Sequence, residues 1–135
     1  MTPEPIFLSV AEILAIHQNQ VELYGGDKGV RDLSLLISAV AIPESTFGGQ
    51  YLHTDVFEMA AAYAFHICMN HPFIDGNKRT GLVTALVFLD YNGIQVEDPD
   101  EILYEAMMSI ASGEKQKKYL TEILRKLGTK EKRMQ

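Results

Sequence analysis

Apolar residues recur at helical spacing along most of the chain, and capping residues mark where the first helices begin. The sequence Ser9-Val10-Ala11-Glu12 is typical of a capping box, in which the serine hydroxyl and the glutamate carboxylate each accept a hydrogen bond from the other's backbone amide. The apolar pattern that follows predicts a helix over residues 10–24, ended by Gly25-Gly26. Asp32 predicts the cap of a second helix, ended by Pro43, whose inward residues are Leu33, Leu36, Ile37 and Val40.

The middle of the chain predicts a buried helix. Residues 56–69 are apolar on nearly every side except at Glu58 and His66, which is typical of a helix at the centre of a bundle. Pro72 ends this helix, and the next is expected to begin near Asn77 and to close at Asn92.

The last third predicts two more helices. Asp98-Pro99-Asp100-Glu101 is expected to open the fifth, with proline at its first position, and Gly128 to end the sixth. Residues 94–96 and 47–52 are expected to be short extended pieces. We therefore predict an all-α fold, a single compact bundle of about six helices over residues 1–128, followed by a charged, frayed tail over residues 129–135.

Length and composition fit one soluble domain. The chain has 135 residues, of which 47% are hydrophobic, so it can bury a core without disulfides. Its one cysteine, Cys68, excludes an internal disulfide and fits a reducing cytoplasm. The N-terminus lacks the basic region of a signal peptide, and the uncharged stretch over residues 59–74 is too short to span a bilayer. We expect a cytoplasmic protein without a membrane segment.

Charge is unevenly distributed. The net charge of -6 argues against direct nucleic-acid binding, which needs a basic face. Eight of the twelve basic residues lie in residues 114–135, and the first 113 residues hold only four against fifteen acids. Two of those four, Lys78 and Arg79, are adjacent, which indicates a local site for an anion.

That site falls in residues 71–81, HPFIDGNKRTG, between the central helix and the next one. A helix N-terminus presents unpaired amides and a partial positive charge, which suits phosphate. Gly76 lets an anion approach the backbone, and Lys78 and Arg79 add full charges. Asn77 can cap the helix or donate to a phosphoryl oxygen.

Two further residues of this stretch suggest catalysis. Asp75 would repel a bare anion, but it suits a Mg²⁺ ion held between a carboxylate and phosphates. His71 can accept a proton from an attacking hydroxyl. Together with the anion site, these are the parts of phosphoryl or nucleotidyl transfer. A purely structural role is the alternative for each residue, as a cap, a turn former or a solvated cation; His17, His53, His66 and Cys68 are expected to be structural.

The stretch resembles the signature of the Fic/Doc superfamily, H-x-F-x-[DE]-G-N-x-R, and within it the Doc (death-on-curing) branch of toxin–antitoxin toxins. The similarity extends over residues 16–32, 41–54, 60–80 and 85–93. The resemblance implies that His71 is the general base acting on a hydroxyl of a target protein, and that Asp75 binds Mg²⁺. It also implies phosphate contacts from Gly76, Asn77 and Arg79 and a buried anchor at Phe73.

Two positions depart from the AMP-transferring Fic pattern. Lys78 stands where that pattern has glycine, and Leu82 stands where it has a second arginine. Both departures are similar to the Doc branch, described as kinases that pass the γ-phosphate of ATP to a threonine of elongation factor Tu and so arrest translation. The resemblance thus favours a kinase, with a protein AMP transferase as the alternative.

The resemblance also implies how the protein meets its partners. Residues 48–52, which are Gly48, Gly49, Gln50, Tyr51 and Leu52, correspond to a flap that can pair with an extended target segment. The family's inhibitory motif, [ST]-x-x-x-E-[GN], begins at Thr54 but is broken by Met59, which implies inhibition by a separate antitoxin protein. Two other classes stay open: a metal phosphohydrolase using His66, His71 and Asp75, and a non-catalytic interaction module.

Overall fold

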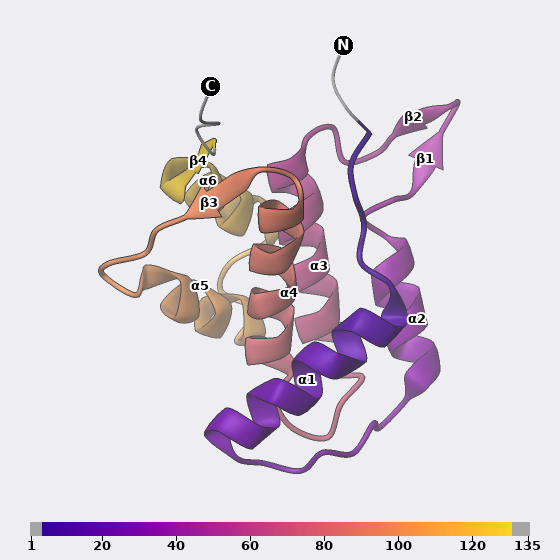
Figure 1. Ribbon diagram of the computed structural model, residues 1–135, viewed down its shortest axis with the longest axis vertical. Coiled ribbons are helices and arrows are strands. Elements are labelled where there is room, and N and C mark those ends of the chain that lie inside the picture. Colours follow the sequence, from indigo (N-terminus) through magenta and orange to yellow (C-terminus); the bar gives the residue numbers. More distant parts are fainter. Residues whose placement is uncertain (1–3, 131–135) are drawn as a thin grey trace.

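The computed structural model describes residues 4–130 as a helical bundle with two small antiparallel pairs of strands (Figure 1). The predicted all-α fold of six helices is confirmed. The elements are α1 (Val10–Tyr24), α2 (Leu33–Ala41), β1 (Thr46–Phe47), β2 (Gln50–Tyr51), α3 (Val56–Asn70), α4 (Asn77–Tyr91), β3 (Ile94–Val96), α5 (Ile102–Ala111), α6 (Lys117–Leu127) and β4 (Gly128–Lys130).

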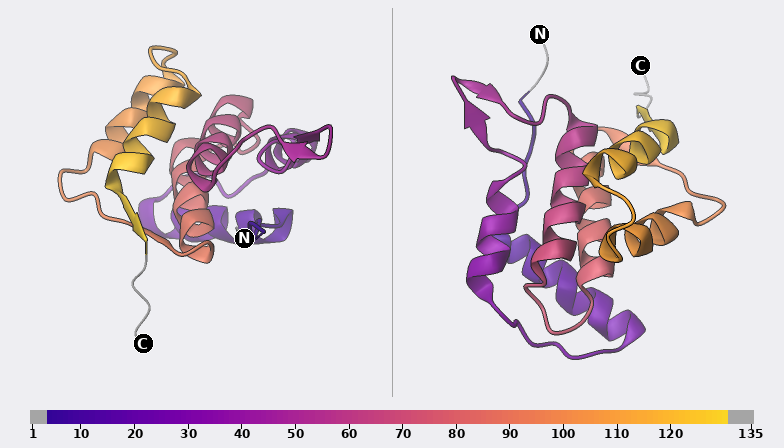
Figure 2. Two further views of the ribbon diagram at one scale, coloured as in Figure 1. Left: turned by 90° about the horizontal axis from the view of Figure 1, so that it is seen from above. Right: turned by 180° about the vertical axis from the view of Figure 1, so that it is seen from behind.

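Helix α3 occupies the centre, as its apolar sequence predicts. It packs against α2, α4, α5 and α6, and Figure 2 shows it between α2 on one side and α6 on the other. Its buried side chains are mostly small, and they include four alanines with no exposed surface: Ala60, Ala61, Ala62 and Ala64. Small side chains let neighbouring helices approach closely, and the closest approach is that of α4. There Gly81 lies against the backbone of Ala64, where a side-chain Cβ would come within 2.7 Å of the Ala64 carbonyl oxygen.

The local signals read from the sequence place most helix ends correctly. Ser9 and Glu12 form the expected capping box of α1, and Asp32 caps α2 through the amides of Ser34 and Leu35. Helix α5 starts later than expected, so the expectation for Pro99 is wrong: it lies in the turn before the helix. The Asp98 carboxylate instead accepts the amides of Ile102 and Leu103, which makes it the residue that satisfies the free donors at this helix end.

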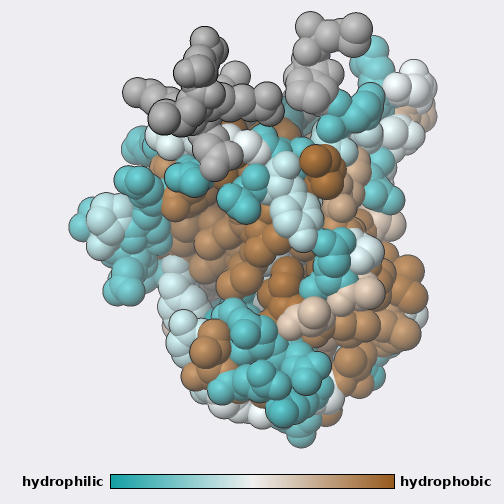
Figure 3. All heavy atoms as spheres, viewed as in Figure 1, coloured by the Kyte–Doolittle hydropathy of each residue, from teal (hydrophilic) through white to brown (hydrophobic). Residues whose placement is uncertain are grey.

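Helix α2 buries only one narrow face. Leu36, Ala39 and Val40 are buried, whereas Leu33 and Ile37 are 48% and 51% exposed, so their expected inward orientation is wrong. The reason is that α2 lies at the edge of the bundle, where it packs mainly on α3 and makes fewer contacts with α1. Figure 3 shows the face on which α1 lies, where mostly polar side chains cover the C-terminal half of α1 and apolar ones gather above it.

The strands account for the extended pieces. Strands β1 and β2 form a hairpin whose turn is Gly48-Gly49, and β3 pairs antiparallel with β4. Thr129 and Lys130 belong to β4, so the tail begins as a paired strand and not as the frayed end expected; residues 131–135 lie outside the described residues. Among residues 4–130, no helix is long and apolar enough to cross a membrane.

Candidate functional site

The loop over residues 71–76 joins the two central helices and has a backbone shaped at both ends. His71 ends α3 in a left-handed conformation with φ of 49°, and its side chain is exposed. Gly76 precedes α4 with φ of 82°, a value that glycine adopts without the strain that a side chain would introduce. These two left-handed residues turn the chain sharply, so that the loop ends with the N-terminus of α4 open to solvent.

The Asn77 side chain fixes the conformation of this loop. Its side-chain oxygen accepts the Phe73 amide at 3.0 Å, and its side-chain nitrogen donates to the Phe73 carbonyl at 2.9 Å. The expectation that Asn77 caps α4 is therefore wrong, because the N-cap is Gly76, which makes no side-chain cap hydrogen bond. Both polar groups of the side chain are engaged within the loop, so the first-turn amides of α4 remain to bind an anion.

Phe73 anchors the loop in the core, as expected. It is 1% exposed and stacks on the imidazole of His17, with ring centroids 3.7 Å apart and planes 6° from parallel. The Nε2–H of His17 donates to the Asp75 carbonyl at 2.8 Å. Sequence reasoning placed His17 in the core but did not connect it to the motif. The sequence did offer one signal, which is that His17 lies one turn before Val21 on α1. In the structure the side chains of both residues lie against Gly76.

A second chain segment, residues 25–31, runs along the motif loop, and the sequence alone did not reveal it. The Asp27 amide donates to Asp75 Oδ2 at 2.7 Å, and the Ile74 amide donates to the Gly29 carbonyl at 3.1 Å. Val30 forms an antiparallel bridge with Phe73. These contacts hold the Asp75 carboxylate in one place although its side chain is exposed.

Arg31 ties this segment to the end of α3. Its Nε donates to the His71 carbonyl at 2.7 Å, and its NH2 group donates to the Asn70 carbonyl at 3.1 Å. Carbonyls at a helix C-terminus are unpaired and carry partial negative charge, so a guanidinium is a suitable partner for them. The only hint in the sequence was that Arg31 is one of the few cations in the acidic first 113 residues.

Arg79 is held between two tyrosine rings. Its guanidinium carbon lies 4.1 Å from the centre of the Tyr24 ring and 5.0 Å from that of Tyr104. Aromatic faces attract a guanidinium and restrict its motion. The two tyrosines come from the ends of α1 and α5, so Arg79 links three helices. No pattern in the sequence predicts this arrangement.

The charged residues line a depression of about 370 Å³. Its walls combine the motif with residues 24–26 and Tyr104, and the motif residues in it are Asp75, Gly76, Asn77, Lys78 and Arg79. The structure thus brings together the residues that the sequence predicts to bind phosphate and the carboxylate that it predicts to bind Mg²⁺. The lining, among residues 4–130, does not include His71, which lies at the start of the same loop.

A neighbouring depression of about 480 Å³ shares Tyr24, Arg79 and Tyr104 with the first. Leu82 lies in its wall, and three carboxylates, those of Asp100, Glu101 and Glu105, also line it. This second depression is therefore acidic apart from Arg79.

The predicted flap is not beside the motif. Residues 46–51 form the hairpin just before α3, and the motif loop follows α3, a helix of 15 residues and therefore about 22 Å long. Figures 1 and 2 show the hairpin and the loop at opposite ends of this helix. Tyr51 instead packs against Phe7 and donates to Glu4. The segment that does lie along the motif is residues 25–31.

Comparisons with known proteins identify the family of this chain. A family model described as the Fic/DOC family matches residues 7–89, which include α1 to α3, the motif and all but the last two residues of α4. The chain is 33% identical over 120 residues to "Protein kinase doc" of Escherichia phage P1, covering 89% of this chain and 94% of that protein. It is 41% identical over 73 residues to "Toxin Doc" of Mycolicibacterium smegmatis, covering 54% of this chain and 56% of that protein.

Proposed function

Because the chain belongs to the Fic/Doc family, we propose that it is the toxin of a toxin–antitoxin pair and acts as an ATP-dependent protein kinase. The proposed reaction transfers the γ-phosphate of ATP to a serine or threonine hydroxyl of a translation factor similar to elongation factor Tu, in the cytoplasm. The proposal rests mainly on the motif loop. Along this loop follow the exposed imidazole of His71, the fixed carboxylate of Asp75 and the open N-terminus of α4 with its two cations.

The residues fit the roles that phosphoryl transfer needs. The exposed His71 imidazole accepts the proton of the attacking hydroxyl. The first-turn amides of α4, with Lys78 and Arg79, bind phosphate oxygens, and the two tyrosines hold the Arg79 guanidinium ready for them. Preorganised charge of this kind lowers the barrier most when it needs no rearrangement during the reaction.

The carboxylate of Asp75 fits a Mg²⁺ ion that is shared with ATP. Within residues 4–130 no group of three or more His, Cys, Asp or Glu side chains could hold a metal by itself. Mg²⁺ commonly takes one or two carboxylates from the protein and the rest of its ligands from substrate phosphates and water. The bound ion would neutralise phosphate charge, and the hydrogen bond from the Asp27 amide keeps the Asp75 carboxylate facing the phosphate site.

The neighbouring depression supports a kinase over an AMP transferase. A second arginine at position 82 would hold further phosphates, but Leu82 stands there, and Asp100, Glu101 and Glu105 line the same wall. Carboxylates repel a polyphosphate, so we expect the phosphates of ATP to bind at Lys78 and Arg79 and not in this second depression. AMP transfer stays the second candidate, because His71, Asp75 and Arg79 would serve either reaction.

The test is a reaction of the purified chain with Mg-ATP and candidate translation factors, read by intact mass. We expect one added phosphate on the target and no added AMP. The His71→Ala variant should lose transfer while its melting temperature is kept, because Phe73 and Asn77 still hold the loop. Added AMP would replace the kinase with an AMP transferase, and no modification of any tested factor by an otherwise active protein would refute the proposed target.

Arg79→Ala should lower catalytic efficiency by about 2–4 kcal/mol in transition-state terms, as expected for one preorganised charge contact. Lys126→Ala is the matched control, because Lys126 is an exposed cation at the far end of α6. A change of less than about twofold for Arg79→Ala would show that Arg79 does not contact the phosphates. Transfer should also stop when a cognate antitoxin protein is added, since the inhibitory motif in this chain is incomplete at Met59.

A further inference from the structure

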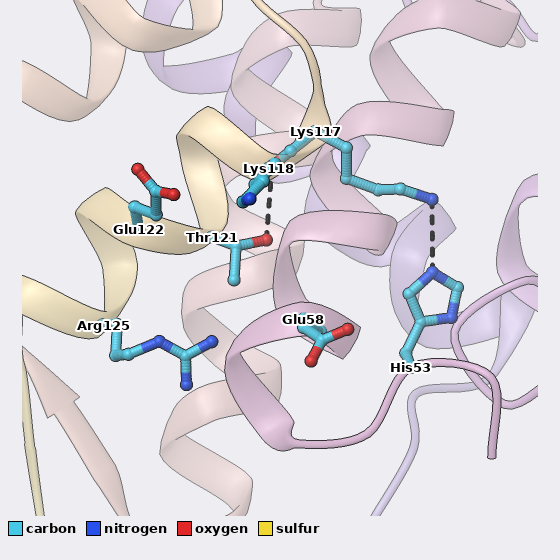
Figure 4. Close-up of a pocket in the computed structure, with 7 residues that line it drawn as sticks. All are labelled: His53, Glu58, Lys117, Lys118, Thr121, Glu122 and Arg125. Carbon is cyan, nitrogen blue, oxygen red and sulfur yellow. Dashed lines mark hydrogen bonds between the residues drawn. The ribbon is translucent and has the colours of Figure 1, made fainter.

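A separate pocket of about 460 Å³ lies between the start of α6, α3 and the segment that follows β2. None of the residues that line it belongs to the motif loop. Figure 4 shows the seven: His53, Glu58, Lys117, Lys118, Thr121, Glu122 and Arg125. The pocket therefore gathers amines, imidazole and carboxylates from three parts of the chain that the proposed transfer reaction does not use.

Lys117 lies at the centre of this group. Its Nζ is 2.9 Å from Nε2 of His66 and 3.2 Å from Nε2 of His53, so two imidazoles from different segments converge on one amine. Figure 4 shows the lysine side chain extending from the first turn of α6 to the His53 ring. The lysine nitrogen also lies 5.8 Å from the centre of the Phe65 ring.

No carboxylate neutralises this amine. In the described part of the chain the ion pairs are Lys28 with Glu22 and Arg125 with Asp55. Glu58 lines the pocket, but its Oε2 accepts the Thr54 hydroxyl at 2.6 Å. The Lys117 amine is thus partly buried beside uncharged bases, whereas a structural lysine at such a place is normally paired.

The surroundings favour the uncharged form of these groups. Burial lowers the pKa of Lys117, and the charge of Glu58 opposes this effect only in part. Burial, with the charge of Lys117, lowers the pKa of His66 to about 4 and also lowers the pKa of His53. At neutral pH the His66 imidazole is therefore uncharged, and the Nε2 atoms of both imidazoles can accept hydrogen bonds from the amine. The charged groups on the rim, Lys118, Glu122 and Arg125, come from α6.

We propose that Lys117 is a nucleophilic amine and that this pocket binds small aldehydes or ketones covalently, as an imine on Lys117 Nζ. A buried lysine with a reactive, uncharged amine is the usual basis of imine formation in proteins. The cavity volume admits a small carbonyl compound beside the amine. The proposal is independent of the transfer reaction at the motif.

The chemistry balances without an added oxidant or reductant. The uncharged amine donates its electron pair to the carbonyl carbon, and a C–N bond forms while the carbonyl π electrons move to oxygen. A nitrogen proton passes to an imidazole Nε2 of His53 or His66, and the oxygen takes up a proton. A second such transfer releases that oxygen as water and leaves a C=N bond.

The experiment uses the full chain and two probes, propionaldehyde and glyoxylate, each with sodium cyanoborohydride, which reduces the imine to a stable secondary amine. Adducts are located by peptide mapping after short reactions between pH 6 and 9. At pH 7 the initial rate at Lys117 should exceed that at the neighbouring Lys118 by about fivefold or more, because an ordinary lysine is almost wholly protonated there. The rate at Lys117 should also begin to rise at a lower pH than the rate at Lys118.

Lysines within the same molecule serve as the internal controls, so the result does not depend on a variant that folds. Lys118 and Lys115 are exposed and differ from Lys117 mainly in lacking the two imidazoles. Lys117→Arg should lose the fast adduct while Lys118→Arg keeps it, and His66→Asn should slow it severalfold. Equal labelling of Lys115, Lys117 and Lys118, or labelling of Lys117 slower than the other two, would overturn the proposal. Faster labelling by glyoxylate alone would restrict the ligand to carbonyl compounds that carry an anion.

Discussion

Gly81→Ala should destabilise the protein although alanine is the better helix former. In the structure the added Cβ would lie 2.7 Å from the Ala64 carbonyl oxygen and 3.3 Å from the Ala64 Cα. Both are backbone atoms of the buried central helix, so they can move only if α3 and α4 separate. Such overpacking costs about 1–3 kcal/mol, and the gain in helix propensity returns at most about 1 kcal/mol.

We therefore expect the free energy of unfolding to fall by about 1–2 kcal/mol, and the melting temperature by roughly 3–8 °C for a chain of this size. Urea denaturation followed by circular dichroism measures the first quantity and a thermal scan the second. The control is Asp90→Ala on the same helix, because the Asp90 side chain is exposed and alanine is smaller than aspartate. A Gly81→Ala protein as stable as the unsubstituted one would show that α3 and α4 do not approach as closely as described.

Three further outcomes are expected. Leu82→Arg should gain AMP incorporation from α-labelled ATP and lose γ-phosphate transfer; a folded variant that keeps only γ-transfer would show that position 82 does not choose the reaction. The contribution of His66 to stability should be full above pH 6.5 and fall as the pH drops from 6.5 through 4, because unfolded His66 takes up a proton that the folded form resists. The lowered pKa corresponds to about 3 kcal/mol, which solvent screening of this half-buried ring reduces to about 2 kcal/mol, and His66→Gln should flatten the profile. Asn77→Ala should lose transfer and about 1–3 kcal/mol of stability, because it leaves the Phe73 amide unpaired. The same loss of stability without loss of transfer would show that the reaction does not depend on the conformation of this loop.

The fold could be predicted from the sequence because its signals are local. The capping box at Ser9, the cap at Asp32 and the break at Pro72 each act within one turn of helix, and they mark the helix ends that the structure has. Where a local signal competes with another, the prediction failed. Pro99 suits a first helical position, but the Asp98 carboxylate accepts the free amides of Ile102 and Leu103, so α5 starts at Ile102.

The candidate site could be predicted only as far as the motif itself. Its residues are adjacent in sequence, so their chemistry could be recognised without knowing the fold. The partners that fix them come from elsewhere: His17 from α1, Arg31 from the loop after it, and Tyr104 from α5. A single sequence does not encode such long-range contacts as a pattern. The position of the hairpin could not be predicted for the same reason, because composition marks an extended piece but not the end of the bundle at which it lies.

The contacts between residues 25–31 and the motif loop decide where this chain can accept foreign sequence. Exposed, glycine-rich loops are the usual places for insertions and new termini. Residues 25–31 have that composition, but one inserted residue would shift Val30 away from Phe73 and withdraw Arg31 from the His71 carbonyl. A tag or fused domain is better placed at the Gly48-Gly49 turn, where added atoms meet nothing within 4 Å and the motif is a full helix length away.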